Sequence, residues 1–269
     1  MNGKQLKHAL HAGALVFGTA IYAPSPVWAT KVKQLGIDMV FIDSEHTPHD
    51  RSMISWMCHA YSALDMAPVV RIPEPDPYLA QMALDGGAHG IIAPYVESPE
   101  QVRVLGGAVK YGPVKGEKLR GMINGVTPEA ELEGYLAAHN AHHNLFINIE
   151  SVPALDALDD ILAVPHIDAV LVGPHDLSCS LGIPERYDHP AFEEAIQTII
   201  AKSRTAGVGV GIHHNFLQQQ IGWVRSGANL VMHSSDISSF LRMLTAEFQE
   251  LRKAVNADAG RVREQSVNL

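Results

Sequence analysis

Eight short and nearly continuous apolar runs recur along this chain of 269 residues, and segments with a helical pattern separate them. A strand that is covered on both faces, as in a parallel sheet, has such an uninterrupted apolar run. Many of the intervening segments begin with Ser or Asp, carry Pro in the first turn and end in Gly, which is the usual punctuation of helices. The apolar runs are residues 14–21, 39–45, 68–72, 90–96, 144–150, 169–176, 208–214 and 229–235.

Eight strand–helix units predict an α/β fold, namely a single-domain (β/α)8 TIM barrel over residues 1–255. A doubly wound sheet is the alternative. Residues 111–143 are too many for a plain connection between a helix and the next strand, so we expect an added helix at 128–139 and a loop that carries Arg120. Residues 256–269 are polar and are expected to form a C-terminal tail.

The composition excludes several classes of function. The net charge of −9 argues against non-specific binding to nucleic acid or to an anionic membrane. No stretch approaches the roughly 20 apolar residues of a membrane helix, and the N-terminal residues do not resemble a cleaved leader. The two cysteines, Cys58 and Cys179, lack the spacing of a zinc or redox motif. We therefore expect a cytoplasmic enzyme with small-molecule substrates.

Ionisable residues are concentrated where the apolar runs end, and barrel enzymes carry their chemistry at the C-terminal ends of the strands. The stretch FIDSEHTPHD, residues 41–50, is the clearest case, because an apolar strand leads directly into acids and histidines. The candidate rim residues are Asp43, Glu45, His46, Arg71, Asn148, Glu150, His175, Asp176, His213, His214, His233 and Asp236.

Glu150 and Asp176 end neighbouring strands of the predicted barrel. Two adjacent carboxylates repel each other unless a cation lies between them, and Mg²⁺ or Mn²⁺ suits a site of two carboxylates with waters and substrate oxygens. Separate helix-capping roles are the alternative for these two residues. Arg71 is expected to hold a substrate carboxylate with its planar fork, or else to form a structural ion pair with Asp43 or Glu45.

His46 is a candidate general base, with a hydrogen-bonded loop histidine as the alternative. Asp85, in the helix after the third strand, either orients His46 or is an ordinary surface residue. No role is assigned to His213 or His214. None of the lysines falls in a predicted strand, which disfavours an aldolase that forms a Schiff base.

Five stretches, in this order and at these distances, resemble the HpcH/HpaI aldolase family of class II pyruvate aldolases over residues 10–250. They are FIDSEHTPHD, PVVRIPEPDP, GAHGIIAPYVES, NIES and LVGPHDLSCSLG. The resemblance implies a (β/α)8 barrel that assembles as a homohexamer, a trimer of dimers, with the last helix exchanged between subunits. It also implies reversible cleavage of a 4-hydroxy-2-oxo acid into pyruvate and an aldehyde through a metal-stabilised enolate.

The same resemblance implies roles for individual residues. Glu150 and Asp176 would bind a divalent metal, which is Mg²⁺, Mn²⁺ or Co²⁺. Arg71 would hold pyruvate and its enolate, and His46 would be the base, with Asp85 as its partner across a subunit boundary. The remaining residues implied are the substrate-binding Asn148, Gly173, Pro174 and His175, with Asp43 and Glu45 behind them.

Three residues depart from the pattern of the family, and they concern the acceptor aldehyde rather than the metal–enolate half of the reaction. Ser44 stands where glycine is common, Asn148 where glutamine is frequent and His175 where a small residue is usual. Alternative functions are therefore a divergent enolate enzyme that decarboxylates oxaloacetate or joins another acceptor, and a barrel that only binds a small oxo acid. A citrate-lyase-like protein would need a coenzyme A site, for which no basic stretch is present.

Overall fold

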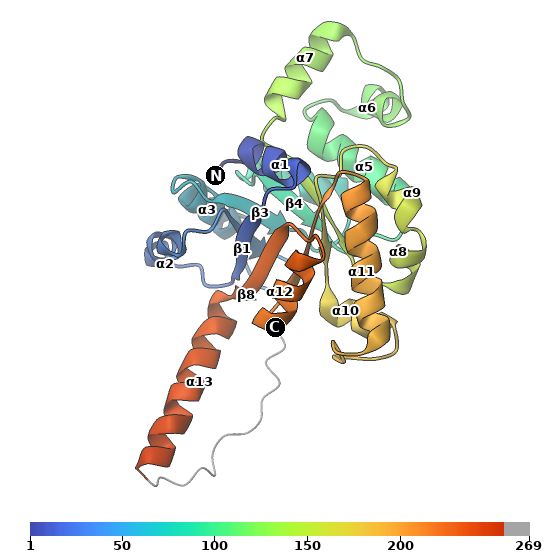
Figure 1. Cartoon of the computed structure of the whole chain (residues 1–269). Coiled ribbons are helices and arrows are strands. Elements are labelled where there is room, and N and C mark those ends of the chain that lie inside the picture. Colours follow the sequence, from blue (N-terminus) through green and yellow to red (C-terminus); the bar gives the residue numbers. More distant parts are fainter. Residues whose placement is uncertain (256–269) are drawn as a thin grey trace.

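The computed structural model describes residues 1–255, and its eight parallel strands form one closed barrel in sequence order (Figure 1). The prediction of a single-domain (β/α)8 TIM barrel is confirmed, whereas the predicted tail at 256–269 lies outside the described residues. Neighbouring strands pair in register, for example Asn148 with Leu171. The strands are β1 (Val16–Ile21), β2 (Met39–Asp43), β3 (Ala67–Arg71), β4 (Gly90–Ala93), β5 (Asn144–Ile149), β6 (Ala169–Val172), β7 (Gly209–His214) and β8 (Leu230–Ser235).

Most helices lie where the sequence predicts them. They are α2 (Pro26–Val32) with the short 3-10 turn Lys33–Leu35, α3 (Arg51–Ser62), α4 (Pro77–Asp85), α5 (Pro99–Tyr111), α7 (Ala130–His139), α8 (Val152–Asp156), α9 (Leu158–Leu162), α11 (Pro190–Thr205), α12 (Leu217–Arg225) and α13 (Asp236–Ala254).

Three helices were not predicted: α1 (Gly3–Ala12), α6 (Gly116–Ile123) and α10 (Pro174–Ser180). The expectation of a loop around Arg120 is wrong, because Arg120 lies within α6. Its helix has a Gly at its first position and no side-chain cap, so the usual start signal is missing from the sequence. The prediction of a helix at 128–139 matches α7 to within two residues at its start.

The amino-terminal end of the barrel is closed by α1. Its Leu6 and Leu10 are fully buried in one cluster with inward-facing strand residues such as Phe41 and Phe146. The amide of Asn144, at the start of β5, donates to the carbonyl of Gly3 at 3.0 Å. Because this end is filled, the opposite rim, where the strands end, is left for a functional site.

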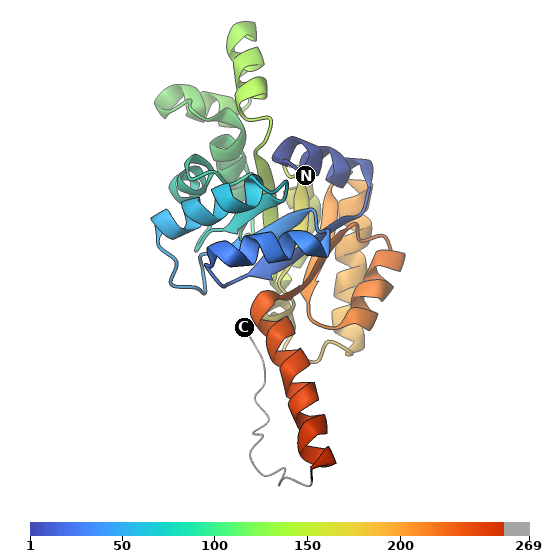
Figure 2. The same cartoon turned by 90° about the vertical axis from the view of Figure 1, so that its left-hand side faces the viewer.

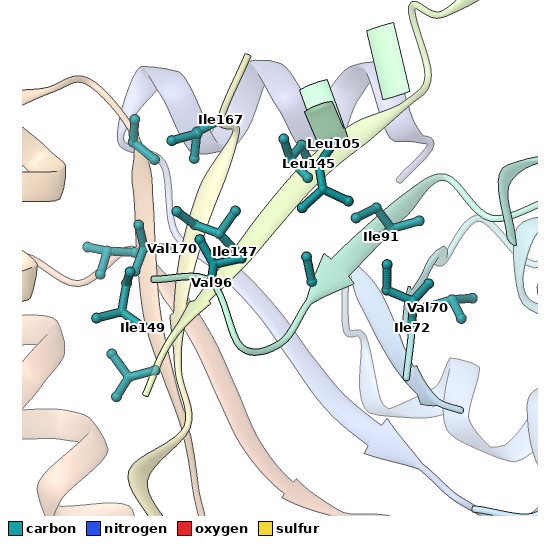
Figure 3. Close-up of a cluster of buried hydrophobic side chains, with 14 of the residues drawn as sticks. Val70, Ile72, Ile91, Val96, Leu105, Leu145, Ile147, Ile149, Ile167 and Val170 are labelled. Carbon is teal, nitrogen blue, oxygen red and sulfur yellow. The ribbon is translucent and has the colours of Figure 1, made fainter. Parts of the chain in front are cut away.

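A second apolar layer lies between the strands and the surrounding helices. Figure 3 shows part of it, with aliphatic side chains from β3 to β6 packed among the helices. This layer explains why the strands have continuous apolar runs, since both of their faces are covered. The labelled members are Val70, Ile72, Ile91, Val96, Leu105, Leu145, Ile147, Ile149, Ile167 and Val170.

The last helix, α13, extends away from the barrel in both views (Figures 1 and 2). Several of its large apolar side chains are exposed, among them Phe240 and Phe248 at 59% and 50%. Meanwhile the outer wall at β1 and β8 has an apolar groove of about 280 Å³, lined by Phe17, Val231 and Val224 among others. Within residues 1–255, no helix has the length and apolar character needed to cross a bilayer.

Candidate active site

Two carboxylates converge at the carboxyl ends of β5 and β6. Glu150 directly follows β5, and Asp176 lies in the first turn of α10, which begins two residues after β6. A Cβ atom at Gly173 would lie only 2.7 Å from Glu150 Oε2 and 3.5 Å from Asp176 Oδ2. Glycine at this position therefore leaves open a small space that both carboxylates face. The structure brings together the two residues that the sequence proposed as metal ligands.

The surroundings of Glu150 favour a cation. Burial raises the pKa of Glu150, and the nearby charge of Asp176 raises it further, while two hydrogen bonds act against this. These bonds come from the backbone N–H of Tyr95 at 2.7 Å and the Nδ2 of Asn148 at 2.9 Å. A divalent cation would relieve the repulsion between the carboxylates, so these residues fit a Mg²⁺-type ion.

This centre offers two carboxylates rather than a full protein cage. Among residues 1–255, no group of three or more His, Cys, Asp or Glu side chains is arranged to hold an ion. Mg²⁺ commonly binds through one or two carboxylates and completes its shell with waters and substrate oxygens, so the pair suffices. The Oδ1 of Asn148 is buried and has no hydrogen-bond partner in the described chain, which leaves one more acceptor beside the pair.

Arg71, the last residue of β3, is held rigidly at the same rim. Its Nε and Nη2 donate to the two carboxylate oxygens of the fully buried Asp43, at 2.9 and 2.7 Å. Its Nε also lies 3.1 Å from Glu45 Oε2. Burial disfavours both charges, but the bonds between Arg71 and Asp43 outweigh it, so the pKa of Asp43 is lowered and that of Arg71 is raised.

The predicted structural ion pair of Arg71 is thus present, and it does not use the whole guanidinium. Within the described chain, Nη1 makes no hydrogen bond, and the side chain is 13% exposed. Arg71 also lies over the ring of Phe41, with Cζ 5.2 Å from the ring centroid. A fixed arginine with a free donor at the rim can still bind an anionic oxygen.

Tyr95 links the two halves of the site, although no feature of the sequence points to it. Its hydroxyl donates to Glu45 Oε1 at 2.6 Å, while its backbone N–H binds Glu150. The hydrogen bond to Glu45 is the main reason why the pKa of Tyr95 is raised to about 12, so the phenol stays protonated. Its backbone has a φ of +55°, which is unusual for a residue other than glycine. A large residue held in this strained conformation, two residues after the end of β4, points to a functional position.

His46 lies beside this chain of contacts, whereas Asp85 does not. The Nε2 of His46 is 3.8 Å from Glu45 Oε1, and its side chain is 60% exposed. Asp85 is the last residue of α4, at the amino-terminal end of the barrel, where it accepts a hydrogen bond from Gln81 at 2.8 Å. Within one chain the two residues therefore lie at opposite ends of the barrel.

Of the other predicted rim residues, His233 of β8 lines the outer groove at β1 and β8, and the rest lie at the start of α10, at the start of α13 or in β7. Gly173, Pro174 and His175 form the start of α10 next to the carboxylate pair, and His175 Nδ1 lies 3.7 Å from Glu185 Oε1. Asp236 accepts hydrogen bonds from the backbone of residues 22 and 23 and so fixes the loop after β1.

The two histidines of β7 are oriented differently. Burial lowers the pKa of His213 to about 4, so its ring is neutral, and its Nε2 donates to the Ser234 carbonyl at 3.0 Å. His214 packs instead against Tyr187, Phe216 and Trp223. We therefore assign His214 to the structural framework.

Residues 20–242 match the family described as HpcH/HpaI aldolase/citrate lyase. The 2-keto-3-deoxy-L-rhamnonate aldolase of Escherichia coli K12 is 32% identical over 228 residues, which cover 84% of each chain. The hydroxypyruvate/pyruvate aldolase of Roseovarius nubinhibens is 34% identical over 209 residues, 77% of this chain and 80% of that protein.

Solved structures are similar over nearly the whole chain. An HpcH/HpaI aldolase/citrate lyase family protein from Burkholderia cenocepacia J2315 superposes with a TM-score of 0.80 at 28% identity and covers 93% of this chain and 99% of its own. The citrate synthase SbnG also gives a TM-score of 0.80, at 26% identity, with 93% and 98% covered.

Proposed function

The chain belongs to the HpcH/HpaI aldolase/citrate lyase family, and we propose on this premise that it is a divalent-metal-dependent aldolase. Its reaction is the reversible cleavage of a 4-hydroxy-2-oxo acid into pyruvate and an aldehyde. Two relatives with aldolase names, at 32% and 34% identity, support this reaction class. The observation that supports it best is the convergence of Glu150 and Asp176 around the open position at Gly173.

Glu150 and Asp176 would hold the ion, and Mg²⁺, Mn²⁺ or Co²⁺ fits their oxygen donors. When bound, the metal would supply Lewis acidity toward the keto and carboxylate oxygens of the 2-oxo acid. The start of α10, at Gly173 and Pro174, would lie against the substrate carboxylate. Asn148 Oδ1, which is buried without a partner in the described chain, would accept a hydrogen bond from a water or a substrate hydroxyl.

Arg71 would stabilise the enolate oxygen. Asp43 occupies Nε and Nη2 of the guanidinium, so Nη1 is the group that can donate to the substrate. Because Asp43 fixes the fork before the substrate arrives, the positive charge needs no reorganisation when negative charge develops. This role is supported by the strand order, in which β3 with Arg71 lies between β2 on one side and β5 and β6 on the other, and by Glu45, which contacts Arg71 and lies 3.8 Å from His46.

His46 would act as the base in the cleavage direction. It removes the proton of the C4 hydroxyl, and the oxygen electrons form the aldehyde carbonyl as the C3–C4 bond breaks. The electron pair of that bond forms the enolate of pyruvate, with its charge on the C2 oxygen beside Arg71. Protonation at C3 then gives the methyl group of pyruvate, and aldol addition follows the reverse path.

We propose that Asp85 orients His46 from a neighbouring subunit, since the two residues lie at opposite ends of one barrel. The projecting α13 supports a homo-oligomer in which this helix is exchanged. Its exposed apolar residues need a partner surface, and the apolar groove at β1, β8 and α12 is not covered by any helix within residues 1–255. A hexamer built from such dimers is the assembly we propose.

Hydrogen–deuterium exchange of the pyruvate methyl group tests the enolate half of this function. In ²H₂O with Mg²⁺ or Mn²⁺, NMR is expected to show loss of the methyl proton signal, and EDTA is expected to stop it. If the methyl protons of pyruvate do not exchange with solvent in the presence of any divalent metal, the protein is not a pyruvate aldolase.

A second candidate is a synthase-type enzyme that joins the enolate to an acceptor other than an aldehyde, or that decarboxylates oxaloacetate. The likeness to a citrate synthase structure at 26% identity supports this second candidate. Oxaloacetate turnover in the absence of aldehyde, faster than pyruvate methyl exchange, would select this candidate over the aldolase.

A further inference from the structure

A cavity of about 530 Å³ opens at the carboxyl-terminal rim beside His46. We infer that it is the subsite for the aldehyde and that it selects an uncharged aldehyde with an apolar chain. This inference rests on the proposed function, and it specifies the substrate class of the same site. The volume lies within the range of about 300–1,000 Å³ that is usual for small-molecule pockets, so the cavity can hold considerably more than acetaldehyde.

Apolar side chains from three separate elements make up half of the residues that line the cavity. They come from the loop after β1, from the loop that precedes α3 together with the first turn of α3, and from the first turn of α13. The residues are Tyr22, Pro24, Pro48, Met53 and Ile237.

Hydrogen bonds within the chain hold this wall in place. Asp236 accepts hydrogen bonds from the backbone N–H groups of Tyr22 and Ala23, at 3.1 and 2.9 Å, which ties the loop after β1 to the start of α13. Two prolines stiffen the loops further, since proline fixes its own φ. A preformed apolar wall gains affinity from an apolar ligand without the cost of ordering a loop.

The cavity lies on the side of His46 at which the acceptor aldehyde would bind. His46 lines it, and the same imidazole lies 3.8 Å from Glu45, which in turn contacts Arg71. An aldehyde whose carbonyl oxygen lies at His46 and whose carbonyl carbon faces the enolate at Arg71 therefore has its chain directed into the cavity. The carboxylate pair lies farther around the rim, at the ends of β5 and β6.

The charges around the cavity discriminate against an anionic acceptor. Within residues 1–255 of one subunit, its polar lining consists of Asp43, His46, Thr47, His49 and Asp50, without a lysine or an arginine. The residue that the proposed function adds from a neighbouring subunit, Asp85, is also an acid. The two carboxylates are engaged elsewhere, Asp43 with Arg71 and Asp50 with the backbone N–H of Met53. A second carboxylate on the aldehyde would thus lose its hydration beside two acids and without meeting a lysine or an arginine of the described lining, which is costly.

Two aldehydes of similar length test this inference on the wild-type protein. Pentanal and succinic semialdehyde differ mainly at the far end, which is a methyl group in one and a carboxylate in the other. With pyruvate and Mn²⁺, we expect kcat/KM for aldol addition to be at least about tenfold higher for pentanal. Acetaldehyde serves as the small acceptor that does not reach the cavity wall.

Substitutions at Met53 test the location of the subsite. Met53→Trp fills the cavity and is expected to lower kcat/KM for pentanal at least about tenfold, while acetaldehyde is affected much less. Met53→Arg adds the missing cation and is expected to raise kcat/KM for succinic semialdehyde relative to pentanal. Both variants retain the backbone N–H of residue 53, which donates a hydrogen bond to Asp50 Oδ1. Val126→Trp, at a 61% exposed position between α6 and α7, is the control.

The outcomes separate this inference from the proposed function. Equal or better use of succinic semialdehyde by the wild type would overturn the inference while leaving the aldolase intact. The same conclusion would follow if Met53→Trp slowed acetaldehyde and pentanal equally. Pyruvate methyl exchange without addition to any aldehyde would overturn both the inference and the aldolase and would favour the second candidate, an enolate enzyme with another acceptor. A protein with neither exchange nor addition would overturn the proposed function and the inference together.

Discussion

Arg71 and Asp43 are joined by two parallel hydrogen bonds, from Nε to Oδ1 at 2.9 Å and from Nη2 to Oδ2 at 2.7 Å. This pairing fixes the plane of the guanidinium at the ends of β2 and β3, whose register places Asp43 opposite Arg71. Arg71 can therefore form the structural ion pair and still bind substrate, because the pair uses Nε and Nη2 and leaves Nη1 available.

Arg71→Lys is expected to lower the rate of pyruvate methyl exchange by about 10²–10³-fold, the usual effect of losing one preorganised donor at a developing oxyanion. Lysine keeps the positive charge but has no planar fork to match Asp43. NMR exchange rates of the variant and of Arg103→Lys, an exposed arginine on α5, give the comparison. An unchanged rate would remove Arg71 from the mechanism.

Tyr95→Phe removes one hydroxyl and leaves the backbone link to Glu150 in place. A hydrogen bond to a charged group contributes about 1.5–3 kcal/mol, so we expect kcat for cleavage to fall at least about tenfold as Glu45 loses its fixed orientation. KM for the 2-oxo acid should change little. Tyr135→Phe, at a 51% exposed position on α7, is the matched control. If both variants keep the wild-type kcat, the hydroxyl of Tyr95 plays no part in positioning Glu45.

His46→Ala and Asp85→Ala are each expected to lower cleavage by about 10²–10⁴-fold, the usual range for a general base. If the two residues act together across a subunit boundary, oligomers that contain both variants will include sites with an intact His46 and an intact Asp85. Co-expression with two affinity tags isolates such oligomers, and part of the wild-type rate is expected to return. Mixed oligomers as inactive as the separate variants would argue against a shared site.

The helix α13 is expected to hold the oligomer together. Phe240→Glu and Phe248→Glu place charges on its exposed apolar face and should produce smaller species, because burying an unpaired carboxylate is unfavourable. Light scattering after gel filtration measures the molar mass. Glu247→Gln on the same helix is the control. A monomeric wild type would contradict helix exchange.

The strands could be predicted from sequence because each is covered on both faces and its apolar run is nearly unbroken. Run boundaries were less accurate at the rim, where His175 and Asp176 were assigned to the end of a strand but belong to α10. Their helix starts with Gly173 and Pro174, and its short length leaves no repeating apolar pattern to detect. The helix α1 has an Asn cap, but its mixed composition resembles an irregular N-terminal segment.

The sequence places the carboxylate pair, Arg71 and His46 at one rim because each lies at the end of a predicted strand or directly after it. Tyr95 lies inside the apolar run 90–96, where an aromatic residue is typical of the core, although β4 itself ends at Ala93. Its left-handed backbone cannot be inferred from its side chain. The cavity beside His46 cannot be predicted from the sequence either. Its walls come from segments more than 200 residues apart, such as Tyr22 and Ile237, which only the closed barrel brings together.

The most direct test of the central claim is pyruvate methyl exchange in the variants Glu150→Gln and Asp176→Asn. With saturating Mn²⁺, wild-type protein and the control Glu100→Gln, an exposed acid on α5, should exchange at the same rate. Both site variants should show no metal-dependent exchange, and their affinity for Mn²⁺, measured by electron paramagnetic resonance, should fall as well. Wild-type exchange rates in either site variant, or exchange that persists in EDTA, would contradict a metal-dependent enolate mechanism at this pair.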